Sequence, residues 1–428
     1  MTGAAEQTHW LSWHAVPRPS FSGGNELQLL RGGDQLFPAQ AEAIAKAHHE
    51  VWLATYIFHD DEAGQALVAQ LCAAAARGVR VRLVVDGFGS KASLDWLCRQ
   101  FAGTGVAMAV FRPIDRWWRW LQPGQLRRLH QKLCVVDGER AFVGGINIIG
   151  DRMDLNHGAT DTPRLDYAVG LRGPIVAPIA QAARAVWTRA WLGRDFGEEL
   201  LALVRSPEPV ARLRRLAQRL RMPRLNRREP FGQDLAPVHA AFVLRDNLRQ
   251  RRTIERAYVE AIRHARHSVD LITPYFYPGH AFRRALRSAA QRGVRVRLLL
   301  QGKVDYRIAA MAARALYAEL LAQGVLIWEY TPAYLHAKIA VVDGQWATVG
   351  SSNIDPLSLL LNLEANVIVS DAGFASELAA EFEAALAVSS AVESRHWGGS
   401  GLRGVLSRAL VAWLAHVYLR VAGATGRY

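Results

Sequence analysis

Two widely separated stretches of this chain repeat one pattern of helix and strand. Residues 76–87 read ARGVRVRLVVDG, and residues 291–302 read QRGVRVRLLLQG. Each stretch follows a helical pattern rich in Ala and Leu, at 64–76 and 280–291, and each ends as a β-branched strand. Self-similarity of this kind indicates an internal duplication, so the fold must contain two related halves.

A second pair of matching strands precedes these helices. Residues 51–58 read VWLATYIF and residues 269–276 read VDLITPYF, and we align them by matching Tyr56 with Tyr275. Helices that alternate with buried strands predict an α/β fold, with helices layered on a sheet in each half. The distance from these strands to the later repeats is longer in the first half, which therefore carries insertions.

The repeats divide the chain into two lobes, at 24–204 and 241–390, with a linker at 205–240 and a tail at 391–428. The linker is rich in Pro and Arg, and its apolar residues at helical spacing predict a basic amphipathic helix. Such a helix could dock on anionic lipid or act as a solvated connector. The amphipathic or apolar tail, rich in Leu, Val and Trp, could lie on a membrane surface or cap the second lobe.

The net charge of +14 and the pI near 10.2 predict attraction to a polyanion. Nucleic acid and an anionic lipid surface both fit, and an Arg-rich coding composition would produce the same balance. The three cysteines have no spacing typical of a disulfide framework or a metal site, which suits a reducing compartment. No secretory signal is legible, and no run of about 18 apolar residues occurs. Any membrane contact is therefore expected to be peripheral.

The most specific signal is a second repeated motif. The first copy comprises His130, Lys132, Asp137, Gly144, Gly145 and Asn147, and the second comprises His336, Lys338, Asp343, Gly350, Ser351 and Asn353, at identical spacing. Alternate residues of a strand share a face, so each His is expected beside its Lys. Each Asp precedes a Gly, which predicts a hairpin that returns the Asn to the same place. An imidazole, a cation and a neutral donor at one point suit a phosphate group.

The paired HxKxxxxDxxxxxxG(G/S)xN segments, at about 124–151 and 330–357, resemble the HKD motifs of the phospholipase D superfamily. The likeness runs from about Gly24 to about residue 385 and includes the strings RDN, TPYFYPG, QGKVDY and DPLSLLLNLEANV. In this it is similar to the B-type bacterial cardiolipin synthases, which lack N-terminal transmembrane helices. Leu357, where many superfamily members have Arg, and Gly145, the usual first-copy variant, fit that subfamily. The resemblance implies two duplicated phospholipase-D-like α/β/α lobes, packed with pseudo-twofold symmetry around one shared active site.

The resemblance also implies roles for the site residues. One histidine attacks phosphorus and forms a phosphohistidine, while the other protonates the departing alkoxide and then acts as base. The family's usual order makes His130 the nucleophile and His336 the acid, although the residues themselves are symmetric on this point. The non-bridging oxygens would be held by Lys132, Lys338, Asn147 and Asn353. Glu364 and Asp166 would orient the imidazoles, and neither a metal nor a cofactor is implied.

Two further residues belong to the motif and are counted with its catalytic set by resemblance. Asp137 and Asp343 each sit at a predicted Asp-Gly turn. Their physical interpretation is different, because a carboxylate at such a turn is typical of a structural residue. We therefore expect them to make turn and salt-bridge contacts.

The implied activity is that of a cardiolipin synthase, which joins two phosphatidylglycerol molecules and releases glycerol. The implied partner is an anionic phospholipid membrane, bound peripherally at the cytoplasmic face of the inner membrane, with no obligatory nucleic acid. Trp117, Trp118 and Trp120, between Arg116 and Arg119, suit a headgroup boundary or a packed insertion. The rival functions are a phospholipase D hydrolase and a superfamily nuclease, which would show a long basic track with stacking aromatics. The sequence does not indicate an oligomeric state.

Overall fold

The structure is a computed structural model of the chain. It describes residues 19–113, 127–155, 157–204, 238–246, 250–303, 307–355 and 362–393. The Trp- and Arg-rich insertion at 115–124, nearly all of the predicted linker at 205–240 and nearly all of the tail at 391–428 lie outside these ranges. The predictions made for those three segments are therefore not addressed by the structure.

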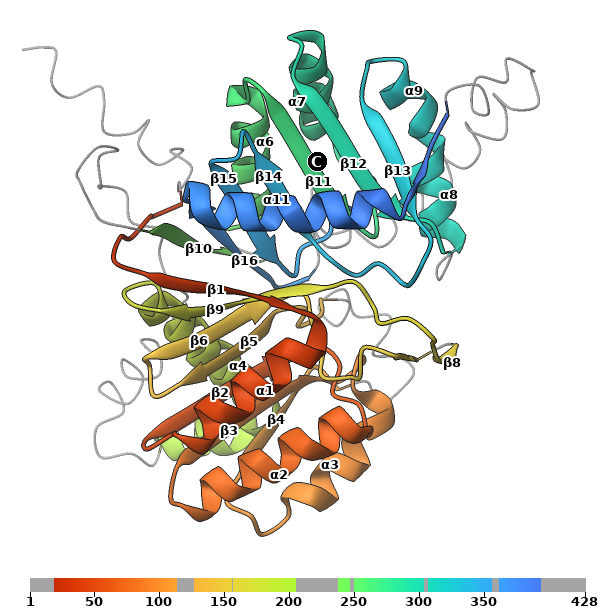
Figure 1. Cartoon of the computed structure of the whole chain (residues 1–428). Helices are drawn as coiled ribbons and strands as arrows, with labels where there is room; N and C mark the ends of the chain where they lie inside the picture. The colour runs from red at the N-terminus through yellow and green to blue at the C-terminus, as the bar shows by residue number, and fades with distance from the viewer. Residues whose placement is uncertain are drawn as a thin grey trace, which may run out of the picture.

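Two large sheets form the described part of the chain (Figure 1). The first contains β1 (Glu26–Arg31), β2 (Glu50–Thr55), β3 (Arg80–Asp86), β4 (Ala107–Phe111), β5 (Lys132–Val136), β6 (Arg140–Gly144) and β9 (Tyr167–Arg172). The second contains β10 (His239–Arg245), β11 (Ser268–Thr273), β12 (Arg295–Gln301), β13 (Leu326–Tyr330), β14 (Ile339–Val342), β15 (Trp346–Gly350), β16 (Glu364–Ser370) and β17 (Ser390–Ala391). A small hairpin, β7 (Met153–Asp154) and β8 (Gly158–Ala159), projects from the first lobe.

The strand orders confirm the duplication. The first sheet has the order β1-β9-β6-β5-β2-β3-β4, and the second has β10-β16-β15-β14-β11-β12-β13-β17. Apart from the added β17, each strand of one sheet has an equivalent at the same place in the other. Both sheets are mixed, with parallel pairs such as β2 with β3 and antiparallel hairpins such as β5 with β6. The predicted α/β fold class and its two related halves are confirmed.

The helices cover the outer faces of the sheets and seal their junction. They are α1 (Gly32–Ala45), α2 (Glu62–Ala76), α3 (Leu94–Phe101), α4 (Val176–Val204), α6 (Thr253–His264), α7 (His280–Gln291), α8 (Arg307–Ala315), α9 (Tyr317–Leu321) and α11 (Ala372–Ala387), with a short 3-10 turn at Lys91–Ser93. The predicted helices at 64–76 and 280–291 correspond to α2 and α7. None of the described helices is both long enough and apolar enough to cross a membrane.

The register of the central strands corrects one detail of the sequence alignment. Val51 pairs with Val136, and Val269 pairs with Val342 at the equivalent place, so Tyr56 corresponds to Pro274. The match of Tyr56 with Tyr275 was therefore wrong by one residue. Both strands are buried on both faces, and Asp270 stands where the first half has Trp52, so no shared alternation of polar side chains was available to fix the register.

The two lobes share one apolar core. Its residues come from both sheets and include Val143 and Val169 of the first lobe and Val349 and Val367 of the second, all fully buried. Strands β6 and β9 lie against β15 and β16, and α11 spans the junction next to β1 (Figure 1). Each such valine contributes about 1.5–3 kcal/mol through burial, so the relative position of the lobes is fixed by packing.

The two predicted Asp-Gly hairpins are present. Asp137 and Asp343 both have φ of +52°, followed by Gly138 and Gly344 at +71° and +62°, as a two-residue primed turn requires. The turn lies at the end of β5 opposite Lys132, about 16 Å away at roughly 3.3 Å per residue. The structure therefore does not bring these two aspartates to the histidines, although they were counted with the catalytic set.

Each turn aspartate instead binds the backbone of a neighbouring loop. The Asp343 carboxylate accepts hydrogen bonds from the backbone N–H groups of Arg266, His267 and Ser268 at 2.7–2.9 Å. Asp137 does the same for residues 48–50, each at 2.8 Å. We expected a salt bridge at each aspartate. Among the described residues, the carboxylates of Asp137 and Asp343 bind these backbone amides instead. The carboxylate thus fixes the start of β2 or β11 against the hairpin.

Replacing Asp343 by Ala should lower the free energy of unfolding by about 1–2 kcal/mol, because three N–H groups lose their acceptor. Partial burial opposes ionisation, but these hydrogen bonds together lower the pKa of Asp343, so its contribution is present at neutral pH. It should be lost as the pH falls through the acidic range. Denaturant titration at pH 7 and pH 3.5 measures both effects. A variant of unchanged stability that loses all activity would instead give Asp343 a chemical role.

Candidate active site

Each histidine segment is anchored to the opposite lobe by its backbone. Leu129 and Leu363 form a parallel bridge, in which the His130 N–H donates to the Leu363 carbonyl at 3.0 Å and the Leu363 N–H to the Arg128 carbonyl at 2.8 Å. The second lobe repeats this with Leu165, whose N–H donates to the Tyr334 carbonyl and whose carbonyl accepts from the His336 N–H. Both histidines therefore lie at the boundary between the lobes.

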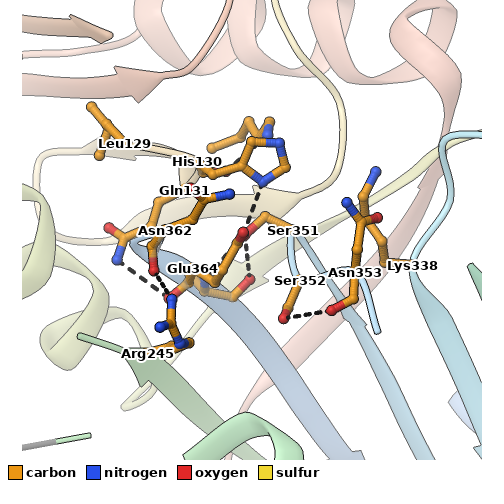
Figure 2. Close-up of polar contacts among 12 residues, drawn as sticks. Leu129, His130, Gln131, Arg245, Lys338, Ser351, Ser352, Asn353, Asn362 and Glu364 are labelled. Carbon is orange, nitrogen blue, oxygen red and sulfur yellow. Dashed lines mark hydrogen bonds and ion pairs between the residues drawn. The ribbon is translucent and has the colours of Figure 1, made fainter. Parts of the chain in front are cut away.

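The same two bridges bring a carboxylate to each imidazole. Nδ1 of His130 lies 2.9 Å from Oε2 of Glu364 (Figure 2). Nδ1 of His336 lies 2.6 Å from Oδ2 of Asp166. A carboxylate at neutral pH accepts, so we assign the proton to Nδ1, which leaves Nε2 of each ring as the reactive nitrogen. Each carboxylate thus orients the histidine of the other lobe. The sequence predicted these four residues but not that the pairs cross between lobes.

The small residue two positions before each motif Asn follows from the length of the carboxylate that it faces. Asp166 and Glu364 occupy equivalent positions, each two residues before the strand residue that pairs with Gly144 or Gly350. Ser351 Oγ donates to Glu364 Oε2 at 2.6 Å. A Cβ on Gly145 would instead lie 2.3 Å from Oδ1 of Asp166. The first copy therefore requires glycine, while the second has room for a serine that supports the longer acid.

The two lysines are buried between these pairs. Nζ of Lys132 donates to the carbonyl of His130 at 2.8 Å, and Nζ of Lys338 donates to the carbonyl of His336. Burial lowers the pKa of Lys132 to about 7 and that of Lys338 to about 8. Lys338 also lowers the pKa of Lys132, whereas the nearby Glu364 opposes this. An anion that enters between the lysines would favour their charged forms, as a phosphate site requires.

Burial also lowers the pKa of both histidines. For His130 the effect is opposed by the charge of Glu364, while His336 is brought well below its ordinary value because Lys338 and Lys132 act in the same direction as burial. The lowered pKa values favour the neutral form of both rings near pH 7. A neutral imidazole with a free Nε2 is the form that can attack phosphorus.

The pKa values of the two carboxylates are shifted in opposite directions within this site. Burial raises the pKa of Asp166 to about 6. Burial acts in that direction on Glu364 too, but the charge and hydrogen bond of His130 leave its pKa below the usual value. The His130 pair therefore contains a firm anion, and the His336 pair contains an acid that titrates near neutrality.

Asn147 and Asn353 follow the second strand of each hairpin, beside the lysines. Gly350 N–H donates to the carbonyl of Lys338 at 3.2 Å, and the chain continues through Ser352 to Asn353, which is buried. In the first lobe, the side-chain carbonyl of Asn147 accepts from the Ile57 N–H at 3.3 Å. That bond leaves the amide NH₂ of Asn147 as a donor for a ligand.

The comparisons with known proteins decide the family. A family model described as "Cardiolipin synthase, PLD-like domain" matches residues 41–160 and 258–386, which is more than half of the chain. Cardiolipin synthase B of Escherichia coli (strain K12) is 38% identical over 361 residues, covering 83% of this chain and 79% of the relative. The chain belongs to the cardiolipin synthase family of phospholipase-D-like proteins.

Within this family the likeness is greater to the B type. Cardiolipin synthase A of Pseudomonas fluorescens (strain SBW25) is 33% identical over 379 residues, covering 88% of this chain and 72% of the relative. The crystal structure of a phosphatidylserine synthase from Haemophilus influenzae Rd KW20 aligns with a TM-score of 0.63 over 97% of each chain, at 12% identity. That likeness shows the fold alone. The resemblance stated from the sequence is confirmed at the level of family and subfamily.

Sequence reasoning missed two residues that position the histidines of this family member. The carboxylate of Asp86, at the end of β3, accepts from the Leu129 N–H at 2.8 Å. At the equivalent place on β12, the Gln301 side-chain carbonyl accepts from the Leu335 N–H at 2.6 Å. Each therefore fixes the residue immediately before a histidine. The repeat alignment of 76–87 with 291–302 already placed the two at one position, which was an available signal.

Tyr56 is a further contact that the sequence did not assign. Its ring meets His130 edge-on at 5.1 Å between centroids, and Nζ of Lys132 lies 5.6 Å from the ring centre. The described residues include no group of three or more His, Cys, Asp or Glu placed to hold a metal ion. The charges of the two lysines act on each other and on His336, so the imidazoles and ammonium groups of both lobes belong to one site.

Replacing Glu364 by Gln should lower turnover by about 10²–10⁴-fold, because an amide can donate to Nδ1 and favour the wrong tautomer of His130. ¹⁵N NMR of the imidazoles gives a readout that does not depend on turnover, since His130 should change and His336 should not. Asp166→Asn is the matched control and should alter His336, although Asp166 belongs to the lobe of His130. Perturbation of the histidine in the same lobe would contradict the crossed arrangement.

Proposed function

We propose that this protein is a cardiolipin synthase that transfers a phosphatidyl group from one phosphatidylglycerol to another. The observation that carries the proposal is the pair of crossed His–carboxylate contacts, His130 with Glu364 and His336 with Asp166, with a buried lysine beside each. Two imidazoles of this kind can handle the two steps of a phosphodiester exchange. No nucleotide is consumed, because one phosphodiester is exchanged for another.

In the first step, Nε2 of His130 attacks phosphorus and the bond from phosphorus to the glycerol oxygen breaks. His336 gives its Nε2 proton to that oxygen, and free glycerol leaves. In the second step, the hydroxyl of another phosphatidylglycerol gives its proton to His336 and attacks the phosphohistidine. Cardiolipin leaves and His130 is regenerated. Lys132 and Lys338 would stabilise the charge on the non-bridging oxygens throughout.

The unlike environments of the histidines support this division of roles. A phosphohistidine needs a firm anion behind its ring, and the charge and hydrogen bond of His130 outweigh burial and leave Glu364 with a lowered pKa. The His336 side chain is 22% exposed against 11% for His130, which suits a group that exchanges protons with alcohols. The bound phosphate would offset the lysine charges that, together with burial, lower the pKa of His336, and so would allow it to act as an acid.

Exposed apolar side chains support contact with a membrane. Phe88, Leu155 and Met311 are 43–52% exposed and come from both lobes. The Phe88 ring lies 5.3 Å from the guanidinium of Arg128, two residues before His130. Leu155 lies in the small hairpin that reaches Tyr334 of the second lobe, through the stacked ring of His157. These residues would enter the headgroup region of an anionic bilayer, to which the net charge of +14 attracts the protein.

We place this contact at the cytoplasmic face of the inner membrane, with phosphatidylglycerol as the lipid partner and no obligatory nucleic acid. A plain hydrolase would release phosphatidic acid by handing the same intermediate to water. A nuclease would use the two histidines on DNA or RNA. The three products are distinct, so one set of incubations separates the three activities.

Purified protein incubated with labelled phosphatidylglycerol should yield cardiolipin and glycerol in equal amounts, and single-stranded DNA should remain intact. His130→Ala and His336→Ala should each reduce turnover to background, because each step needs both rings. Thin-layer chromatography of the lipids and a gel of the DNA measure the outcome. Cleaved DNA with unchanged lipid, or appreciable turnover by either variant, would disprove the proposal.

The double substitution Phe88→Asp with Leu155→Asp should weaken binding to phosphatidylglycerol vesicles by at least about 10-fold, because two apolar side chains lose their burial in the bilayer. Vesicle sedimentation measures this. Leu326→Asp is the matched control: Leu326 is 44% exposed but begins β13, at the opposite end of the strand from the site. Equal binding by all three proteins would contradict docking through this face.

A further inference from the structure

The duplicated lobes differ at the residue that supports each histidine. In the first lobe both carboxylate oxygens of Asp86 are used: Oδ1 accepts from the N–H groups of Phe88 and Gly89, and Oδ2 accepts from that of Leu129. In the second lobe the side-chain carbonyl of Gln301 accepts from the Leu335 N–H. That bond fixes the orientation of the amide, so the other end of the Gln301 side chain is an NH₂ donor.

This NH₂ group has no hydrogen-bond partner among the described residues. Gln301 is only 9% exposed, so the group is shielded from bulk solvent. A buried donor without an acceptor costs about 1–3 kcal/mol, and such groups are rare in folded proteins. An acceptor oxygen that enters beside Gln301 would remove that cost.

A small pocket lies next to this donor. Its lining residues are Pro274, Tyr275, Leu300, Gln301, Ala310, Ala313, Arg314 and Tyr317. The volume of about 10 Å³ for the centre of a water-sized sphere is room for one hydroxyl-sized group. An acyl chain or a phosphate group does not fit that space.

In the first lobe a ring occupies the equivalent place. Tyr56 is the structural equivalent of Pro274, and its ring packs against the loop after β3, where a Cβ on Gly89 would lie 2.8 Å from it. The same ring contacts His130. By the pseudo-twofold relation, the space that Pro274 leaves open lies on the His336 side of the site.

The charged group in the pocket wall is already neutralised. Arg314 donates to both carboxylate oxygens of Glu329, at 3.0 and 3.3 Å, and the Tyr317 hydroxyl donates to the same carboxylate at 3.2 Å. The pocket therefore offers an NH₂ donor in nearly neutral surroundings. A neutral hydroxyl oxygen suits it, whereas an ammonium group would meet a donor where it needs an acceptor.

We propose that this pocket binds the hydroxyl group next to the reacting oxygen of the substrate alcohol, with Gln301 as its donor, and so selects vicinal diols such as the glycerol headgroup. The inference rests on the proposed function and names a specificity-determining residue for it. His336 protonates the leaving alcohol and deprotonates the attacking one, so both alcohols occupy the same place. Both are glycerol units in the proposed reaction, and one pocket therefore serves both steps.

The test is a competition between two alcohols of identical composition. The full chain is incubated with phosphatidylglycerol and equal concentrations of 1,2-propanediol and deuterium-labelled 1,3-propanediol, and the two phosphatidyl products, which then differ in mass, are quantified by mass spectrometry. The wild type should favour the 1,2-isomer by about 10-fold, the effect of one hydrogen bond to a buried donor. Gln301→Glu keeps the acceptor for the Leu335 N–H but removes the NH₂, so the product ratio should approach one.

Gln301 both lines the pocket and fixes the residue before His336. Two further variants separate its effect on the choice of diol from its effect on His336. Ala310→Leu narrows the pocket without touching Gln301 and should also abolish the preference. Asp86→Asn changes the equivalent residue of the first lobe, which lines no such pocket, and should slow turnover while keeping the ratio. A wild type that uses both diols equally, or a preference retained by both pocket variants, would overturn the proposal. Absence of any lipid product from the wild type would overturn the proposed function itself.

Discussion

The active site depends on an exchange between the lobes. Two short parallel bridges, Leu129 with Leu363 and Leu165 with Leu335, carry each histidine to the carboxylate of the opposite half. Neither lobe contains a complete His–carboxylate pair by itself. The shared apolar core therefore has two functions, since the packing that stabilises the protein also sets the distance between the reactive nitrogens. A change in how the sheets meet would separate both pairs at once.

Duplication supplied a symmetric framework, and side-chain differences made it chemically asymmetric. Glu364 and Asp166 are equivalent, yet the pKa of the first is lowered and that of the second is raised to about 6. The one-methylene difference between them determines whether a serine or a glycine stands two positions before the motif Asn. Gln301 and Asp86 are equivalent as well, and only the amide leaves a donor unused. Each difference separates the environments of two histidines that the motif alone leaves identical.

Much of the site was predictable because its signals are local. The His-x-Lys spacing, the Asp-Gly turns and the repeated strands obey short-range rules of strand geometry, and the structure bears them out. The crossing of Glu364 to His130 was not predictable, because it depends on how two sheets pack. The match of Tyr56 with Tyr275 failed by one residue, since these two buried strands share no alternation of polar side chains that would fix their register. Asp137 shows a further limit: motif membership gave no sign that its carboxylate would bind the backbone of another strand.

The protonation states of the two lysines and the two histidines depend on one another. Burial leaves Lys132 and Lys338 with pKa values of about 7 and 8 and favours the neutral form of both histidines. A phosphodiester brings the negative charge that the lysines need to stay protonated and that His336 needs to gain a proton. The donor lipid thereby creates the acid that its own cleavage requires. Since that acid forms beside the pocket at Gln301, the alcohol bound there is the group best placed to receive its proton.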